Sequence, residues 1–86
     1  MIIIPTKYFK KKVSKLPKSI KLKLAKRIHL FMSEQKNIIL NNHQLNGKYS
    51  GYRSINITGD YRVIFEELED GSVRLIDIDT HPNLYQ

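Results

Sequence analysis

Apolar and polar residues alternate with two different periods along this chain. Near the start, Phe9, Val13 and Leu16 lie four and three positions apart, which predicts a short helix after a strand at residues 1–5. Pro17 ends this helix, because proline removes a backbone donor and clashes with the preceding turn.

A second helix is predicted next, although its start also fits a strand. Ile20, Leu22 and Leu24 alternate with lysines as strand residues do. Helical spacing then continues through Ile28 and Phe31 without a turn residue, and lysine, leucine and alanine favour helices. The length of the pattern therefore favours a helix, and the two helices form a basic hairpin with one apolar side.

The second half of the chain reads as strands. After a connector at residues 37–51, three strand-like segments occupy residues 52–57, 61–68 and 73–79. The turns between them, TGD and EDG, are short enough for hairpins. We expect one α+β domain over residues 1–86, with two N-terminal helices packed on one face of a small, mainly antiparallel four-stranded sheet in the order β-α-α-β-β-β.

Alternation along these strands assigns their two faces. Ile55 and Ile57, with Val63 and Phe65, are expected to meet the helices. The opposite face then collects polar and aromatic groups from the strands and from the segments that adjoin them: Tyr52, Ser54, Asn56, Arg62, Asp60, His43, His81 and Tyr85.

This set of groups suits the cleavage of a phosphodiester. The reaction needs one group to take a proton, another to give one, and a cation to stabilise charge on phosphorus. Histidine serves either proton role near neutral pH, and an aromatic ring can hold an unstacked base. A ribose supplies its own nucleophile, the 2′-hydroxyl, so neither a metal nor another cofactor is expected.

Each candidate also has a purely structural alternative. Asp60 is a good turn residue after a glycine, and Arg62 could be a surface arginine on a strand. His43 could pack in its loop, His81 could cap the last strand, and Tyr85 could plug the core. Spacing alone leaves these alternatives open.

Charged residues are distributed unevenly along the chain. Residues 1–36 carry eleven Lys or Arg and one acid, a net charge of +10. Residues 37–86 carry four Lys or Arg and seven acids, a net charge of −3, so the total is +7. This imbalance favours a polyanionic partner over lysines placed only for solubility.

Cysteine content and hydropathy limit the cellular compartments in which we expect the protein to work. The chain has no cysteine, which excludes disulfides and thiolate chemistry. The run MIII is too short for a membrane span or a signal peptide, so we expect a cytoplasmic protein without a membrane partner. Asp77 and Asp79 share a strand face, and we interpret them as solvated carboxylates rather than metal ligands.

The segment HQLNGKYSGYRSINITGDYRVIF, together with IDTHPNLYQ, resembles the RelE/ParE superfamily of bacterial type II toxin–antitoxin toxins, and most closely its YafQ branch. The shared pattern is His-x-Leu-x-Gly, then Gly-Tyr-Arg, then Asp-aromatic, and a terminal histidine with an aromatic residue four positions later. It falls here on His43, Leu45, Gly47, Gly51, Tyr52, Arg53, Asp60, Tyr61, His81 and Tyr85.

This resemblance implies a fold similar to microbial ribonucleases and metal-independent cleavage of mRNA in the ribosomal A site, in the bacterial cytoplasm. His81 would be a general acid or base, with Asp60 and His43 as the other proton-handling groups. Arg62 would stabilise the phosphate charge. The lysine-rich helices would bind ribosomal RNA, and a cognate antitoxin protein would wrap the toxin.

The resemblance also implies substrate contacts, with one departure. Tyr85, Asn56, Tyr61 and Arg53 would position or bind the substrate. Asn56 stands where the YafQ branch has a second histidine, and asparagine cannot shuttle a proton. Two alternatives therefore stay open: a ParE-like toxin that inhibits DNA gyrase, and a member of the fold that binds RNA or protein without catalysis.

Overall fold

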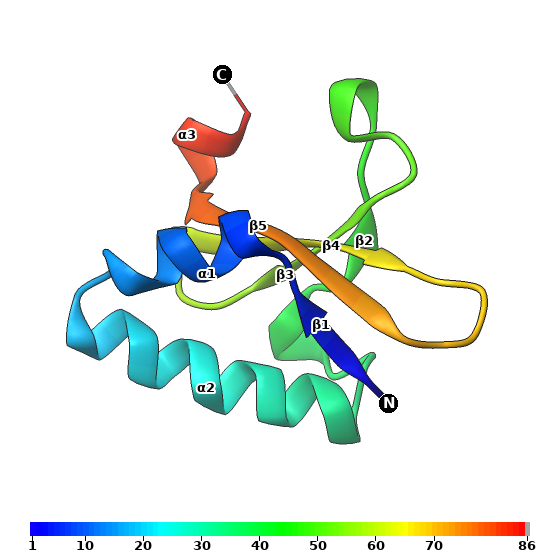
Figure 1. The fold of residues 1–86 in the computed structure, drawn as a ribbon, viewed down its shortest axis with the longest axis horizontal. Coiled ribbons are helices and arrows are strands. Elements are labelled where there is room, and N and C mark those ends of the chain that lie inside the picture. Colours follow the sequence, from blue (N-terminus) through cyan, green and yellow to red (C-terminus); the bar gives the residue numbers. More distant parts are fainter. Residues whose placement is uncertain (86) are drawn as a thin grey trace.

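The first half of the chain forms one strand and two helices. In the computed structural model, which describes residues 1–85, β1 is Ile3–Pro5, α1 is Lys7–Ser14 and α2 is Lys18–Ser33. The hydroxyl of Thr6 accepts a hydrogen bond from the backbone N–H of Phe9 and caps α1. The two predicted helices are therefore confirmed (Figure 1).

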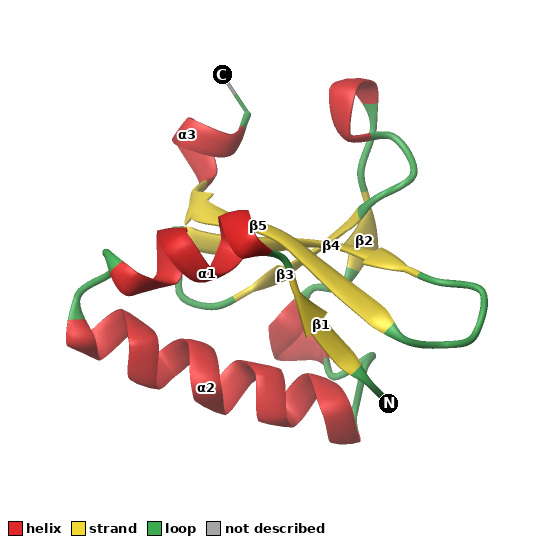
Figure 2. Ribbon diagram, in the orientation of Figure 1, coloured by secondary structure: helices red, strands yellow, loops and turns green. Residues whose placement is uncertain are grey.

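The second half contributes four strands and a short terminal helix. The 3₁₀ turn η1 (Ile38–Leu40) leads into β2 (His43–Gln44), and η2 (Gly47–Tyr49) leads into β3 (Arg53–Asn56). Strands β4 (Tyr61–Glu67) and β5 (Val73–Thr80) form a hairpin, and α3 (His81–Leu84) follows directly. Figure 2 shows these elements by type.

The sheet has the order β1-β5-β4-β3-β2. Strand β1 pairs in parallel with β5, and the other pairs are antiparallel. The mixed sheet and α+β class agree with expectation, but the predicted count of four strands is wrong. The fifth strand, β2, has only two residues, too few to produce a periodic pattern.

The main core lies between the sheet and the helices. Ile55, which pairs with Val63 across β3 and β4, is fully buried there with Phe31 of α2. The Phe31 and Phe65 rings meet edge to face, with centroids 5.0 Å apart. The strand face assigned to the helices is thus confirmed, because Ile55, Ile57, Val63 and Phe65 all belong to the core that contains Phe31.

The other face of the sheet is covered only in part. A smaller apolar cluster unites Leu45, Ile64 of β4 and Leu84 of α3, with Tyr49 and Tyr52 packed at its edge. Figure 1 shows α3 and the loop that carries η2 rising from this side, away from α2. This partial cover accounts for the apolar character of β4 on both faces.

Candidate active site

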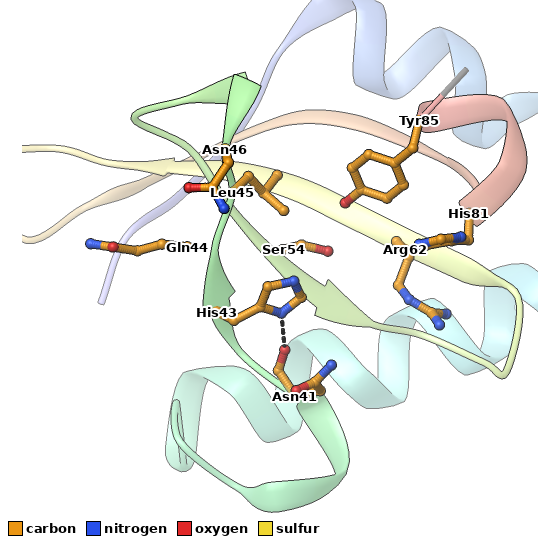
Figure 3. A pocket seen from close by; sticks show the side chains of 9 residues that line it. All are labelled: Asn41, His43, Gln44, Leu45, Asn46, Ser54, Arg62, His81 and Tyr85. Carbon is orange, nitrogen blue, oxygen red and sulfur yellow. Dashed lines mark hydrogen bonds between the residues drawn. The ribbon is translucent and has the colours of Figure 1, made fainter. Parts of the chain in front are cut away.

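A cavity of about 340 Å³ opens on the partly covered face of the sheet, between β2 and α3 (Figure 3). Four of the predicted site residues line it, namely His43, Arg62, His81 and Tyr85. Asn41, Gln44, Leu45, Asn46 and Ser54 complete its wall. His43, Arg62 and His81 can carry positive charge, and no carboxylate from residues 1–85 lines the cavity. The cavity therefore favours an anionic ligand.

His43 reaches the cavity from the edge strand β2. Its Nδ1 lies 2.7 Å from the backbone oxygen of Asn41, which can only accept a hydrogen bond. In the neutral ring Nδ1 therefore carries the proton, and Nε2 keeps its lone pair. Figure 3 shows the ring directed into the cavity with this bond beneath it. His43 is thus arranged to accept a proton from a ligand.

The backbone that positions His43 is itself held in place. Asn41 has φ 46°, in the left-handed region that asparagine tolerates better than most residues. Its neighbour Asn42 accepts a hydrogen bond from Arg53 Nε at 2.8 Å through its side-chain oxygen. Arg53 Nη2 also donates to the Asn42 backbone oxygen at 3.4 Å. Arg53 therefore supports the short strand that carries His43.

His81 and Tyr85 approach the cavity from the opposite side. They lie four residues apart, so the helical turn places them on one face, with ring centroids 4.7 Å apart. Buried Leu84 anchors α3 to the sheet. The backbone N–H of His81 donates to the carbonyl of Asp60 at 2.8 Å, which ties the start of α3 to the β3–β4 turn.

Arg62 is the second residue of β4, next to the β3–β4 turn. Its Nη1 donates to the backbone oxygens of Thr58 and Gly59, both at 3.0 Å, and lies 3.2 Å from that of Tyr61. These contacts hold the β3–β4 turn. Within residues 1–85 all hydrogen bonds of this side chain come from Nη1, which leaves Nε and Nη2 available to a ligand.

The other predicted site residues lie outside the cavity wall. Asp60 is exposed on the β3–β4 turn and contributes its backbone carbonyl. Tyr61 packs against the main core on the helix side. Asn56 lines a separate depression beside α2, and Arg53 lines another beyond β2.

A lysine–carboxylate cluster near α3 corrects one sequence interpretation. Lys12 of α1 lies 3.0 Å from an Asp77 oxygen and 2.8 Å from an Asp79 oxygen, so these carboxylates are ion-paired and not simply solvated. Burial lowers the pKa of Lys12, but hydrogen bonds to Asp79 and Asp77 outweigh it and raise the pKa well above its usual range.

The same cluster reaches α3. The other oxygen of Asp79 accepts from the Asn83 side chain at 3.0 Å and from the Thr80 backbone at 2.7 Å. Burial raises the pKa of Asp79, but the hydrogen bonds from Lys12, Asn83 and Thr80 outweigh it and lower the pKa. The ion pair therefore fixes the helix that carries His81.

Sequence reasoning missed two contributors to the site that local signals could have suggested. Helix α3 has no apolar period, yet Thr80 followed by a proline in the first turn is a common helix start. Strand alternation places Ser54 on the polar face, but no motif in the sequence marks it as a site residue. The contribution of Asn41 has no clear sequence signal, since any residue offers a carbonyl.

Two kinds of structure are absent from the described residues. Residues 1–85 bring together no group of three or more histidine or acidic side chains that could hold a metal ion. No helix within this range is long and apolar enough to cross a membrane.

Residues 1–86 match the model of a family described as "Bacterial toxin of type II toxin-antitoxin system, YafQ". No curated protein matches the sequence. Among solved structures, YafQ from E. coli strain BL21(DE3) has a TM-score of 0.79 and 23% identity over 98% of this chain and 97% of that one.

Two further structures show the same fold. YafQ in the E. coli DinJ-YafQ toxin-antitoxin complex gives a TM-score of 0.76 and 24% identity, covering 98% of this chain and 96% of the other. The YoeB/ParE toxin from Agrobacterium tumefaciens gives 0.73 and 16%, covering 94% and 99%.

Proposed function

Because the chain belongs to the YafQ family of toxins from bacterial type II toxin–antitoxin systems, we propose that it is a metal-independent endoribonuclease that cleaves mRNA in the ribosomal A site. The observation that carries this proposal is the cavity in which two histidines face one arginine. Two imidazoles on opposite walls can serve as base and acid for one phosphodiester.

The geometry supports a specific division of roles. His43 Nε2 takes the proton of the 2′-hydroxyl, and that oxygen attacks the adjacent phosphorus. The bond from phosphorus to the 5′-oxygen breaks, and protonated His81 gives its proton to the departing oxygen. The products are a 2′,3′-cyclic phosphate and a 5′-hydroxyl, so atoms and charges balance without a cofactor.

The remaining cavity residues support this reaction. Arg62 stabilises the added negative charge on phosphorus through its free Nε and Nη2. Tyr85, whose ring lies beside that of His81 at a tilt of 55°, holds a base beside the scissile phosphate. Asp60 lies outside the cavity wall, and its backbone carbonyl positions His81 by accepting from the His81 N–H. Asn56, which lines a separate depression, leaves proton transfer to the two cavity histidines.

The basic helices provide the surface for the ribosome. Eight lysines of α1, α2 and the turn between them are exposed: Lys7, Lys10, Lys11, Lys15, Lys18, Lys21, Lys23 and Lys26. Such a surface binds RNA backbone through salt-dependent contacts. The cognate antitoxin is the second partner of the proposed toxin, as DinJ is in the E. coli DinJ-YafQ complex.

The test compares wild type with His81→Ala and His29→Ala in bacteria and in a translation reaction. His29 is an exposed histidine on α2, outside the cavity, and serves as the matched control. We expect wild type and His29→Ala to stop growth and to cut a reporter mRNA only when ribosomes translate it. We expect His81→Ala to do neither.

Two outcomes would overturn the proposal. Equal toxicity of wild type and His81→Ala would remove this histidine from the mechanism. Growth arrest with intact mRNA and DNA-damage signalling would instead support the gyrase-inhibiting alternative.

A further inference from the structure

One buried polar group in the cavity wall has no partner. Ser54 of β3 is fully buried, and its hydroxyl oxygen forms no hydrogen bond with residues 1–85. Ser72, the other buried polar residue, donates to an Asp70 carboxylate oxygen at 2.6 Å. Asn56 Oδ1 is also buried without a partner among these residues, but Asn56 lines a separate depression. A buried hydroxyl without a partner destabilises a fold, so its presence calls for a physical reason.

The position of Ser54 supplies that reason. It pairs with His43 on β2 and with Ile64 on β4, so it lies at the floor of the cavity between the two strands. Figure 3 shows its hydroxyl directed toward the space that His43, Arg62 and Tyr85 surround. An apolar side chain at this position would leave the strand pairing intact, whereas only a polar one can form a hydrogen bond with a ligand there.

We infer that the Ser54 hydroxyl is a substrate-binding group, which donates a hydrogen bond to a non-bridging oxygen of the scissile phosphate. This inference rests on the proposed function. The hydroxyl lies among potentially cationic side chains, and no carboxylate from residues 1–85 lines the cavity, so its partner is an acceptor carrying negative charge. A phosphate oxygen is the acceptor of this kind that the proposed reaction brings into the cavity, whereas a planar base stacks on Tyr85.

The test compares Ser54→Ala with Ser72→Ala, since both remove a buried hydroxyl from a strand or its edge. Thermal unfolding gives the Tm, and ribosome-programmed cleavage of a reporter mRNA gives the rate. A third measurement is the binding of an mRNA that carries a 2′-deoxy nucleotide at the cut position, which binds without being cut.

The two variants should respond in opposite ways. Ser54→Ala should keep or raise the Tm, because it removes an unpartnered hydroxyl, while both cleavage and binding of the 2′-deoxy mRNA fall about tenfold. Ser72→Ala should lower the Tm, because it strips a hydrogen bond from Asp70, and leave cleavage by the folded protein unchanged.

The outcomes separate this inference from the proposed function. Wild-type cleavage by Ser54→Ala would overturn the role of Ser54 and leave the nuclease assignment intact. A large loss of Tm in Ser54→Ala would show that the hydroxyl serves the fold, which also overturns the inference. If wild type itself cuts no mRNA, the proposed function fails first.

Discussion

The junction of α1, β5 and α3 offers a sharp test of how the site is held together. Asp79 accepts from Lys12 of α1 and from Asn83 of α3, and it adjoins Thr80, whose backbone N–H completes the set. The substitution Asp79→Asn keeps the size of the side chain and one oxygen but removes the charge. It therefore weakens all three contacts without opening a cavity.

The size of the expected loss in unfolding free energy follows from how exposed Lys12 and Asp79 are. A charge-assisted hydrogen bond contributes about 1.5–3 kcal/mol when buried, and an exposed ion pair contributes about 0.2–1 kcal/mol. The side chains of Lys12 and Asp79 are 25% and 27% exposed, between these limits. We therefore expect Asp79→Asn to lose about 1–2 kcal/mol, or about 4–16 °C in Tm for a domain of this size.

The stability that the Lys12–Asp79 pair contributes should depend on pH. The lowered pKa of Asp79 adds stability that is complete above its unfolded value, near 3.8, and is lost as pH falls through the folded value. The raised pKa of Lys12 adds stability that is complete below its unfolded value, near 10.5, and is lost as pH rises through the folded one. The pair is therefore fully effective between about pH 5 and 9.

Thermal unfolding followed by circular dichroism from pH 2.5 to 9 measures this effect. The Tm difference between wild type and Asp79→Asn should be constant from about pH 5 to 9 and should be smaller at pH 2.5, below the unfolded pKa of Asp79. Glu69→Gln, at an exposed acid in the β4–β5 turn, is the matched control and should change little. A difference of equal size at pH 2.5 and pH 7 would refute the ion-pair explanation.

Three further predictions concern the core, the support of His43 and the basic surface. Phe31→Ala should cost about 3–5 kcal/mol, measured by urea unfolding, because the ring is 1% exposed in the main core. Arg53→Met should lower mRNA cleavage more than stability, because it frees Asn42 next to His43. Replacing Lys18 by Gln should flatten the salt dependence of ribosome binding between 50 and 200 mM, by a log–log slope of about 0.7–0.9 if that lysine contacts one phosphate.

Each of these predictions has a contrary result. A small change in the urea midpoint for Phe31→Ala would mean that the helix does not seal the main core. Full cleavage by Arg53→Met would show that His43 needs no support from this side chain. Salt dependence unchanged by Lys18→Gln would place the ribosome contact on another surface.

Much of the fold could be predicted because it follows from periodicity. The helical spacing from Ile20 to Phe31 and the alternation through Ile55 and Ile57 each gather the apolar side chains on one face of an element. The same parity places Tyr61 with Val63, on the helix side, and so already conflicts with the substrate contact that the resemblance implies for Tyr61.

Elements that are short or lack a period could not be predicted in this way. Strand β2 has two residues, and its pairing with β3 comes from the tertiary arrangement of the connector. Helix α3 has four residues and only one buried side chain, Leu84. Both elements nevertheless carry the cavity histidines, so the details of the site depend on the least periodic parts of the chain.

Two basic helices, an amphipathic sheet, and a polar face with His43, Arg62, His81 and Tyr85 as its candidates can all be predicted from the sequence. The folded chain shows in addition which of these groups share a cavity, that Nδ1 of His43 faces a carbonyl, and that Lys12 contacts an aspartate 67 positions later. The difference lies in the distance along the chain over which each kind of information acts. Periodicity reports which face of an element is buried, whereas a site depends on distances between elements far apart in the chain.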